Sequence, residues 1–142
     1  MEYALTDRIS ILHLSKERIA ELRHIKLKEL PFDPDDNSIW TLKTINVDNI
    51  VGVYRPMHAK TWIEMLDYKS CHKNKNFMLF QENGLAEFTK FLLNPPSDDL
   101  PMVIEYNNEY YIAGEGLHRL TIAKCIGNMK ATVAVTKITS YS

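Results

Sequence analysis

The chain has 142 residues, of which 45% are hydrophobic and 25% charged, so it has the length and composition of one globular domain with its own core. Its net charge of −1 argues against a large general nucleic-acid-binding surface, although a local basic patch stays open. No long apolar run predicts a membrane span, and the N-terminus shows no basic start leading into an apolar secretory segment.

The two cysteines, Cys71 and Cys125, are too few and too far apart for a disulfide framework or a Cys-x-x-Cys metal pair. We therefore expect a cytoplasmic protein with reduced thiols. Cys125 falls in a segment of helical pattern, where we expect a core thiol rather than a nucleophile. Cys71 and His72 are neighbours, and adjacent residues rarely bind one metal without further ligands nearby, so no metal site is predicted.

Residues 6–30 alternate apolar and charged positions at helical spacing, which predicts an N-terminal helical extension. Ser15 is the expected N-cap, with Glu17 in the first turn. The apolar stripe consists of Ile19, Leu22, Ile25 and Leu30. The opposite face carries basic residues, namely Lys16, Arg18, Arg23, His24, Lys26 and Lys28. This face has two interpretations: a basic surface for DNA or a protein partner, or a solvated face balanced by the glutamates of the same segment.

Residues 31–38 are rich in proline and aspartate, which is typical of a turn-rich, acidic linker. The spacing of a calcium-binding loop with its closing glutamate is missing. The sequence therefore predicts a boundary here, with a helical extension and linker over 1–38 and the main domain over 39–142.

Three elements are expected in the first half of that domain. Residues 40–47 alternate with period two, with Trp40, Leu42 and Ile45 apolar, and predict a strand. Residues 59–68 have helical spacing, and 71–76 interrupt it. A further amphipathic helix begins near Gly84 and ends before Pro95.

The second half begins with a hairpin, residues 102–106 and 109–113 joined at Asn107-Asn108, which tolerate the positive φ of a tight turn. A helix then runs to Gly127, a typical C′ glycine, and 131–138 supply a last strand. Strand, helix and strand in this order suggest a right-handed crossover. The predicted fold class is α/β (α+β mixed), a small mixed sheet with flanking helices.

The most informative stretch is Gly114-Glu115-Gly116-Leu117-His118-Arg119, between the hairpin and the helix. Glycines let the backbone turn sharply and approach a ligand closely. The helix that follows directs free N–H groups and the positive end of its dipole at the turn, which is a common anion site. His118 and Arg119 would add two donors. The alternative is that the glycines only serve a tight strand-to-helix connection.

This stretch resembles the box of the ParB/sulfiredoxin superfamily, which reads G-E-R-R-x-R in ParB proteins and G-G-C-H-R in sulfiredoxins. The chain has G-E like the first and G-x-H-R like the second. Residues 101–106 resemble the strand before the box, and Tyr54-Arg55-Pro56 resembles a turn near the start of the family's domain. The resemblance covers about residues 41–138.

The resemblance implies that Gly114, Glu115, Gly116, His118 and Arg119 contact a nucleoside triphosphate with Mg²⁺. The ligand would be CTP, as in ParB proteins, or ATP, as in related small-molecule kinases. Glu115 would hold the magnesium ion or a water, or else only cap the helix; Glu115 and His118 are the candidate catalytic residues. Arg55 would contact phosphate or be a surface arginine. Leu117 stands where sulfiredoxins have their reactive cysteine, so sulfiredoxin activity is not expected.

The predicted function is nucleotide binding, with phosphoryl transfer or hydrolysis as the reaction open to the site. The alternative is a non-catalytic protein- or DNA-interaction module that keeps the fold. Partition proteins carry a helix-turn-helix domain after this module, and this sequence ends soon after its last strand, so we expect no partition activity and no helix-turn-helix DNA binding. Arg119 is the expected most sensitive residue, unless it forms a structural bridge with Glu115.

Overall fold

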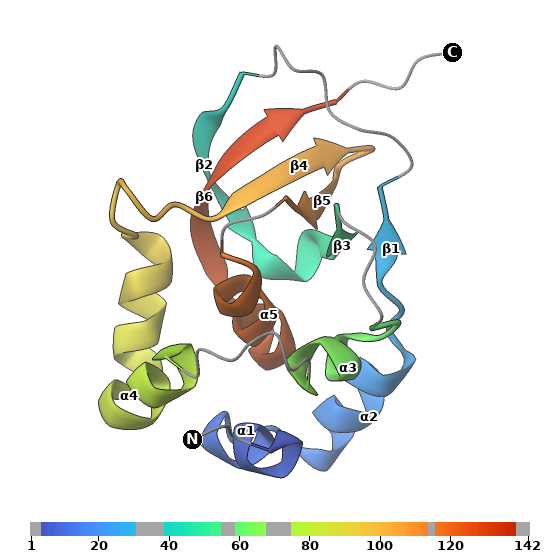
Figure 1. Cartoon of the computed structure of the whole chain (residues 1–142), viewed down its shortest axis with the longest axis vertical. Coiled ribbons are helices and arrows are strands. Elements are labelled where there is room, and N and C mark those ends of the chain that lie inside the picture. The colour runs from blue at the N-terminus through green and yellow to red at the C-terminus, as the bar shows by residue number, and fades with distance from the viewer. Residues whose placement is uncertain (1–3, 31–38, 55–58, 68–74, 114–115, 139–142) are drawn as a thin grey trace.

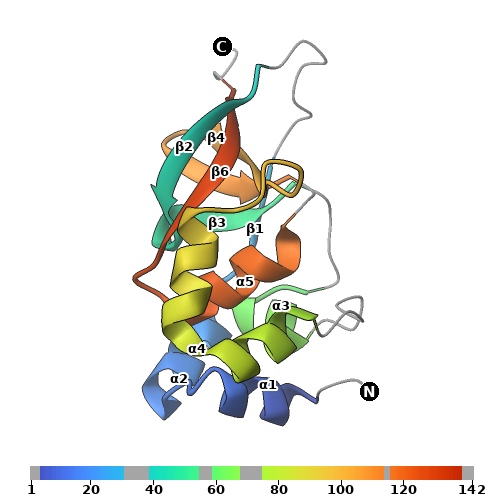
Figure 2. The ribbon, with the colours of Figure 1, turned by 90° about the vertical axis from the view of Figure 1, so that its left-hand side faces the viewer.

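The computed structural model of the chain describes residues 4–30, 39–54, 59–67, 75–113 and 116–138. These residues form a mixed α+β fold with a single six-stranded sheet. Figures 1 and 2 show the sheet in the upper part of the molecule and the helices below it, all on one side of the sheet.

The helices are α1 (Leu5–Ile11), α2 (Lys16–His24), α3 (Trp62–Asp67), α4 (Lys75–Leu93) and α5 (Leu117–Ile126). The strands are β1 (Lys28–Glu29), β2 (Thr41–Asn46), β3 (Ile50–Val53), β4 (Met102–Tyr106), β5 (Glu109–Ile112) and β6 (Lys130–Lys137). A short 3-10 helix, Val47–Asn49, joins β2 to β3.

The sheet has the strand order β1-β3-β5-β4-β6-β2. β4 and β5 form the predicted hairpin, with Asn107 and Asn108 at φ 52° and 63°, as a tight two-residue turn requires. β5 is antiparallel to β4, and β4 is parallel to β6. β5 and β6 therefore run in opposite directions with β4 between them. The predicted right-handed crossover between them is wrong, because the handedness rule applies to parallel strands and the hairpin has already reversed the chain.

The strands bury side chains on both faces of the sheet. Val103 packs in the large core under the sheet, while the next residue, Ile104, packs in a smaller cluster with Tyr111 on the opposite face. Both Val103 and Ile104 are completely buried. The central strands therefore lack the polar face that a half-exposed sheet would show.

The elements of the first half differ in detail from those predicted. In β2, Ile45 is buried but Leu42 is 66% exposed, so the predicted apolar alternation holds only in part. α4 begins at Lys75, within the segment predicted to interrupt the helices, and is kinked at Gly84, where φ is 85° and ψ is 177°. The sequence thus predicts the second half of α4 and misses the first.

The N-terminal segment is integrated into the same core as the rest of the chain. Ser15 is the N-cap of α2, as predicted, and its side chain accepts a hydrogen bond from the Arg18 amide at 3.0 Å. Leu22 is completely buried in the main core, and β1 pairs with β3. The predicted linker and domain boundary at 31–38 lie outside the described residues.

Arg18 binds the C-terminal end of α5. Its Nη2 donates to the Lys124 carbonyl at 2.6 Å and its Nε to the Cys125 carbonyl at 2.9 Å. Carbonyls in the last turn of a helix have no partner within the helix, and a cation there also opposes the negative end of the dipole. One member of the predicted basic face therefore has a structural role inside the chain.

We expect Arg18→Met to lower the free energy of unfolding by about 1–2 kcal/mol, because it removes two charge-assisted hydrogen bonds at a partly exposed position. Urea unfolding measures this loss. Arg23→Met, on the exposed surface of the same helix, is the matched control and should change the value by less than about 0.5 kcal/mol. Equal losses in the two variants would show that Arg18 does not anchor α5.

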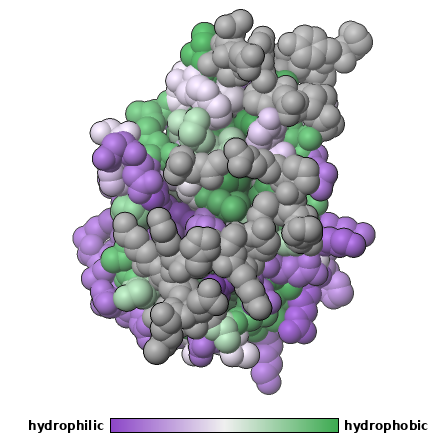
Figure 3. Space-filling model, in the orientation of Figure 1, coloured by the Kyte–Doolittle hydropathy of each residue, from purple (hydrophilic) through white to green (hydrophobic). Residues whose placement is uncertain are grey.

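Hydrophilic residues gather at the lower right of the face shown in Figure 3, over α2. Glu17, Glu21, Arg23 and His24 are exposed in this helix. The mixture of acidic and basic side chains favours a solvated face over a surface for DNA.

No described helix is long and apolar enough to cross a membrane.

Candidate functional site

The start of α5 follows β5 as predicted. β5 ends at Ile112, and α5 begins at Leu117 with Gly116 as its N-cap. The predicted strand and helix are therefore confirmed. Gly114 and Glu115, in the middle of the turn, and the candidate phosphate ligand Arg55 lie outside the described residues.

Gly116 meets two conditions that only glycine satisfies easily. Its φ is 84°, in the left-handed region, where a Cβ is strained. A Cβ at this position would also lie 2.5 Å from Cβ of Pro101, the residue before β4. Gly116 is thus required by the packing of the turn against Pro101, which supports the structural role that the sequence left open beside ligand binding.

The first turn of α5 keeps its backbone donors uncapped by the N-cap residue. Gly116 has no side chain that could accept a hydrogen bond, and the first bond within the helix runs from the Leu120 amide to the Gly116 carbonyl at 2.9 Å. In the first turn of an α-helix, the amide groups precede the first such bond, and the helix itself offers them no carbonyl acceptor. They lie at the positive end of the dipole of a ten-residue helix.

The Arg119 side chain is buried, with 6% of its surface exposed, and binds Asp99. Its Nη2 lies 2.6 Å from Oδ2 of Asp99, and its Nη1 donates to the Asp99 carbonyl at 3.1 Å. The guanidinium carbon lies 4.3 Å from the centroid of the Phe91 ring, within the range of a cation–π contact. Nε of Arg119 has no hydrogen-bond partner among the described residues.

These contacts decide how Arg119 can act. Arg119 forms a structural ion pair with Asp99 of the loop before β4. The predicted partner, Glu115, lies outside the described residues. The side chain of Asp99 is 47% exposed, so the pair is buried on the arginine side only. A bound anion could reach Arg119 only by sharing the guanidinium with this carboxylate, whose own charge would oppose the anion.

A pocket of about 170 Å³ opens at the start of α5. It is lined by Asn76, Leu79, Phe91, Asp99, Gly116, Leu117, His118 and Arg119. The four residues of the box that the structure describes, Gly116, Leu117, His118 and Arg119, all line this pocket. Their role as nucleotide ligands stays a prediction.

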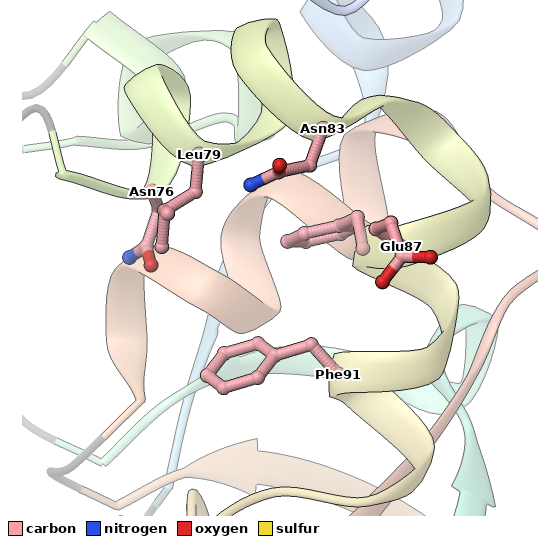
Figure 4. Close-up of a pocket in the computed structure, with 6 residues that line it drawn as sticks. Asn76, Leu79, Asn83, Glu87 and Phe91 are labelled. Atoms are coloured by element: carbon pink, nitrogen blue, oxygen red, sulfur yellow. The ribbon is translucent and has the colours of Figure 1, made fainter.

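A second pocket of about 190 Å³ lies in the bend of α4. It is lined by Asn76, Leu79, Asn83, Glu87, Phe88 and Phe91. Figure 4 shows Asn76 and Leu79 from the first half of α4 on one side, Glu87 from the second half on the other, and Asn83 and Phe91 across from each other. The two pockets are adjacent, since both are lined by Asn76, Leu79 and Phe91.

The other candidate groups in α5 are inert or structural. Cys125 is completely buried, and this burial raises the pKa of its thiol to about 12, so the prediction of a core thiol is confirmed. Burial lowers the pKa of Lys124, whose Nζ donates to the Asp48 carbonyl at 2.9 Å. Cys71 and His72 lie outside the described residues. Within the described ranges, no three His, Cys, Asp or Glu side chains are grouped to hold a metal ion.

Sequence reasoning missed Asp99 and the residues of α4 that line the pockets. Asp99 follows a run of two prolines, which predicts a loop and nothing about its distant partner. Asn83-Gly84 is a dipeptide typical of a chain reversal, and it could have indicated the bend in α4. Phe91 belongs to the amphipathic helix that the sequence predicts from Gly84, and it lines both pockets.

No protein-family model, curated protein or solved structure matches this chain. The resemblance to the ParB/sulfiredoxin superfamily therefore stays a prediction from the residues of the box and its surroundings.

Proposed function

We propose that this chain is a ParB/sulfiredoxin-like domain that binds a nucleoside triphosphate, ATP or CTP with Mg²⁺, at the start of α5. The phosphates would bind the amide groups of the first helical turn, together with Gly114, Glu115, Gly116, Leu117 and His118. Arg55, which follows β3 in the sequence, would add a further phosphate contact.

The observation that carries this proposal is the pocket at the N-terminus of α5. A helix start without a side-chain cap directs backbone donors and partial positive charge into a cavity, which is the arrangement that binds phosphate in many proteins. His118 lines that pocket, so a further donor is present where the phosphates would lie.

Phosphoryl transfer or hydrolysis is the reaction that such a site could support. In this proposal Glu115 would hold the magnesium ion or the attacking water. His118 would accept the proton of the attacking water or hydroxyl group, or donate a hydrogen bond to a phosphoryl oxygen. Arg119 then acts chiefly by fixing the start of α5 through Asp99 and Phe91, and only secondarily as a phosphate ligand.

A thermal-shift screen of nucleoside di- and triphosphates with Mg²⁺ tests the binding. A ligand at a hundred times its dissociation constant should stabilise the folded protein by about 2.7 kcal/mol. His118→Ala should weaken this shift by removing a phosphate donor, while His24→Ala, on the exposed face of α2, is the matched control.

The screen also separates the proposal from its rival, a protein-interaction module that keeps the fold. Two observations favour the rival. The guanidinium of Arg119 is already bonded within the chain, and α4 exposes the apolar residues Met78, Leu79 and Leu85. No stabilisation by any nucleotide, with or without Mg²⁺, would contradict nucleotide binding and leave the interaction module as the better interpretation.

A further inference from the structure

We propose that the pocket in the bend of α4 is the nucleobase subsite of this protein, and that it selects adenine and cytosine, the bases that carry an amino group where hypoxanthine and uracil carry a carbonyl oxygen. This inference rests on the proposed nucleotide binding at the start of α5. It adds the part of the ligand that is recognised and the residues that recognise it.

The first argument is position and size. The two pockets, of about 170 and 190 Å³, are each smaller than the roughly 300–1,000 Å³ typical of small-molecule sites. They share Asn76, Leu79 and Phe91, so together they offer an elongated site with the helix start at one end. A nucleotide has this form, with its phosphates at one end and a flat base at the other.

The second argument is the apolar lining of the α4 pocket. Phe88, Phe91 and Leu79 line it, and aromatic rings stack on bases of any sequence. Arg119 lines only the neighbouring pocket and covers one face of the Phe91 ring, at 4.3 Å from its centroid. Phe91 therefore lies between the Arg119 guanidinium in one pocket and the proposed place of the base in the other.

The third argument is the polar side chains around that lining. Asn76 and Asn83 carry amides, which both donate and accept, and Figure 4 shows the Asn83 amide directed into the space between the two halves of α4. Glu87 carries a carboxylate, which only accepts. Its present partner is Lys90, with Nζ 3.4 Å from Oε1, and both side chains are largely exposed, so a base can replace or share this weak pair.

The carboxylate gives the pocket its selectivity. An acceptor suits the amino group of cytosine or adenine and opposes the carbonyl oxygen that uracil or hypoxanthine presents at the same position. The bend at Gly84 makes this arrangement possible, because it brings Asn76 and Asn83 of the first half opposite Glu87 and Phe91 of the second.

Isothermal titration of the full chain with matched ligand pairs tests the inference. We expect CTP to bind about tenfold more tightly than UTP, and ATP about tenfold more tightly than ITP, the effect of one hydrogen bond to a charged acceptor. Tripolyphosphate, which has no base, should bind more weakly than CTP and ATP. Glu87→Gln should reduce each preference to within about twofold, because its amide can also donate. Glu82→Gln, exposed on the same helix and outside both pockets, should leave the preferences unchanged.

Two results would overturn the subsite, and they are distinct from a failure of the proposed function. Equal affinities for all four nucleotides and tripolyphosphate would be consistent with the phosphate site but would contradict the base subsite. An unchanged base preference in Glu87→Gln would show that the base is not recognised by Glu87 in the α4 pocket. If no ligand binds at all, the result contradicts both the proposed nucleotide binding and the base subsite. The comparison of ligand pairs uses the unaltered protein, so it does not depend on any variant folding.

Discussion

Asp99→Ala is expected to lower the free energy of unfolding by about 2–3 kcal/mol. Removing one partner of a buried ion pair costs about 3–5 kcal/mol because it leaves the other charge buried without compensation. Here the partner left behind, the Arg119 guanidinium, is the buried one, while Asp99 is itself 47% exposed, and this exposure reduces the cost. The Asp99 carbonyl would still accept from Nη1 of Arg119.

The same substitution should strengthen phosphate binding while it weakens the fold. Asp99 places a negative charge in the lining of the pocket at the start of α5. Two unit charges near a protein surface interact by about 1–4 kcal/mol, so its removal should raise the affinity for a nucleotide by about tenfold. Arg119→Ala should instead lower both stability and affinity, because it removes the stacking on Phe91 and the cation.

Urea unfolding and titration of the same two variants measure these opposite signs. Asp98→Ala is the matched control, since it removes an exposed aspartate from the neighbouring position and should change neither quantity appreciably. A gain of affinity in Arg119→Ala, or a loss in Asp99→Ala, would contradict the assignment of the pocket as an anion site.

Gly116→Ala is expected to cost about 3 kcal/mol of stability. Alanine in the left-handed region is strained by about 1–2 kcal/mol. The new Cβ would also lie 2.5 Å from Cβ and 2.8 Å from Cα of Pro101, and overpacking of this kind costs about 1–3 kcal/mol. Both effects act at the N-cap of α5, so nucleotide binding should weaken as well.

Asn108→Ala isolates the first of these two costs. Asn108 has φ 63° in the exposed turn between β4 and β5, so alanine there meets the left-handed strain without the contact to Pro101. Chemical unfolding of both variants gives the difference, which we expect to be about 1–2 kcal/mol. The same loss in both would show that Pro101 moves aside at no cost and that Gly116 is needed for its backbone conformation alone.

Elements with local signals could be predicted from the amino-acid sequence alone. Ser15 caps α2, Asn107 and Asn108 make the hairpin turn, and Gly127 ends α5 at φ 82°. Each of these signals acts within a few residues of the chain, through a backbone hydrogen bond or a permitted φ. The burial of Cys125 follows in the same way from the helical period of its neighbours.

Contacts between distant residues became visible only in the folded chain. Arg119 binds a residue 20 positions away, and Arg18 binds the end of a helix more than 100 positions away. The order of the strands placed β4 between β5 and β6, and the bend at Gly84 set residues of α4 beside the start of α5. Such contacts depend on how whole helices and strands pack against one another. Sequence periodicity and short motifs do not predict which distant residue a side chain will contact. The box at the start of α5 could therefore be found from the sequence, whereas the ion pair that holds Arg119 and the second pocket beside it could not.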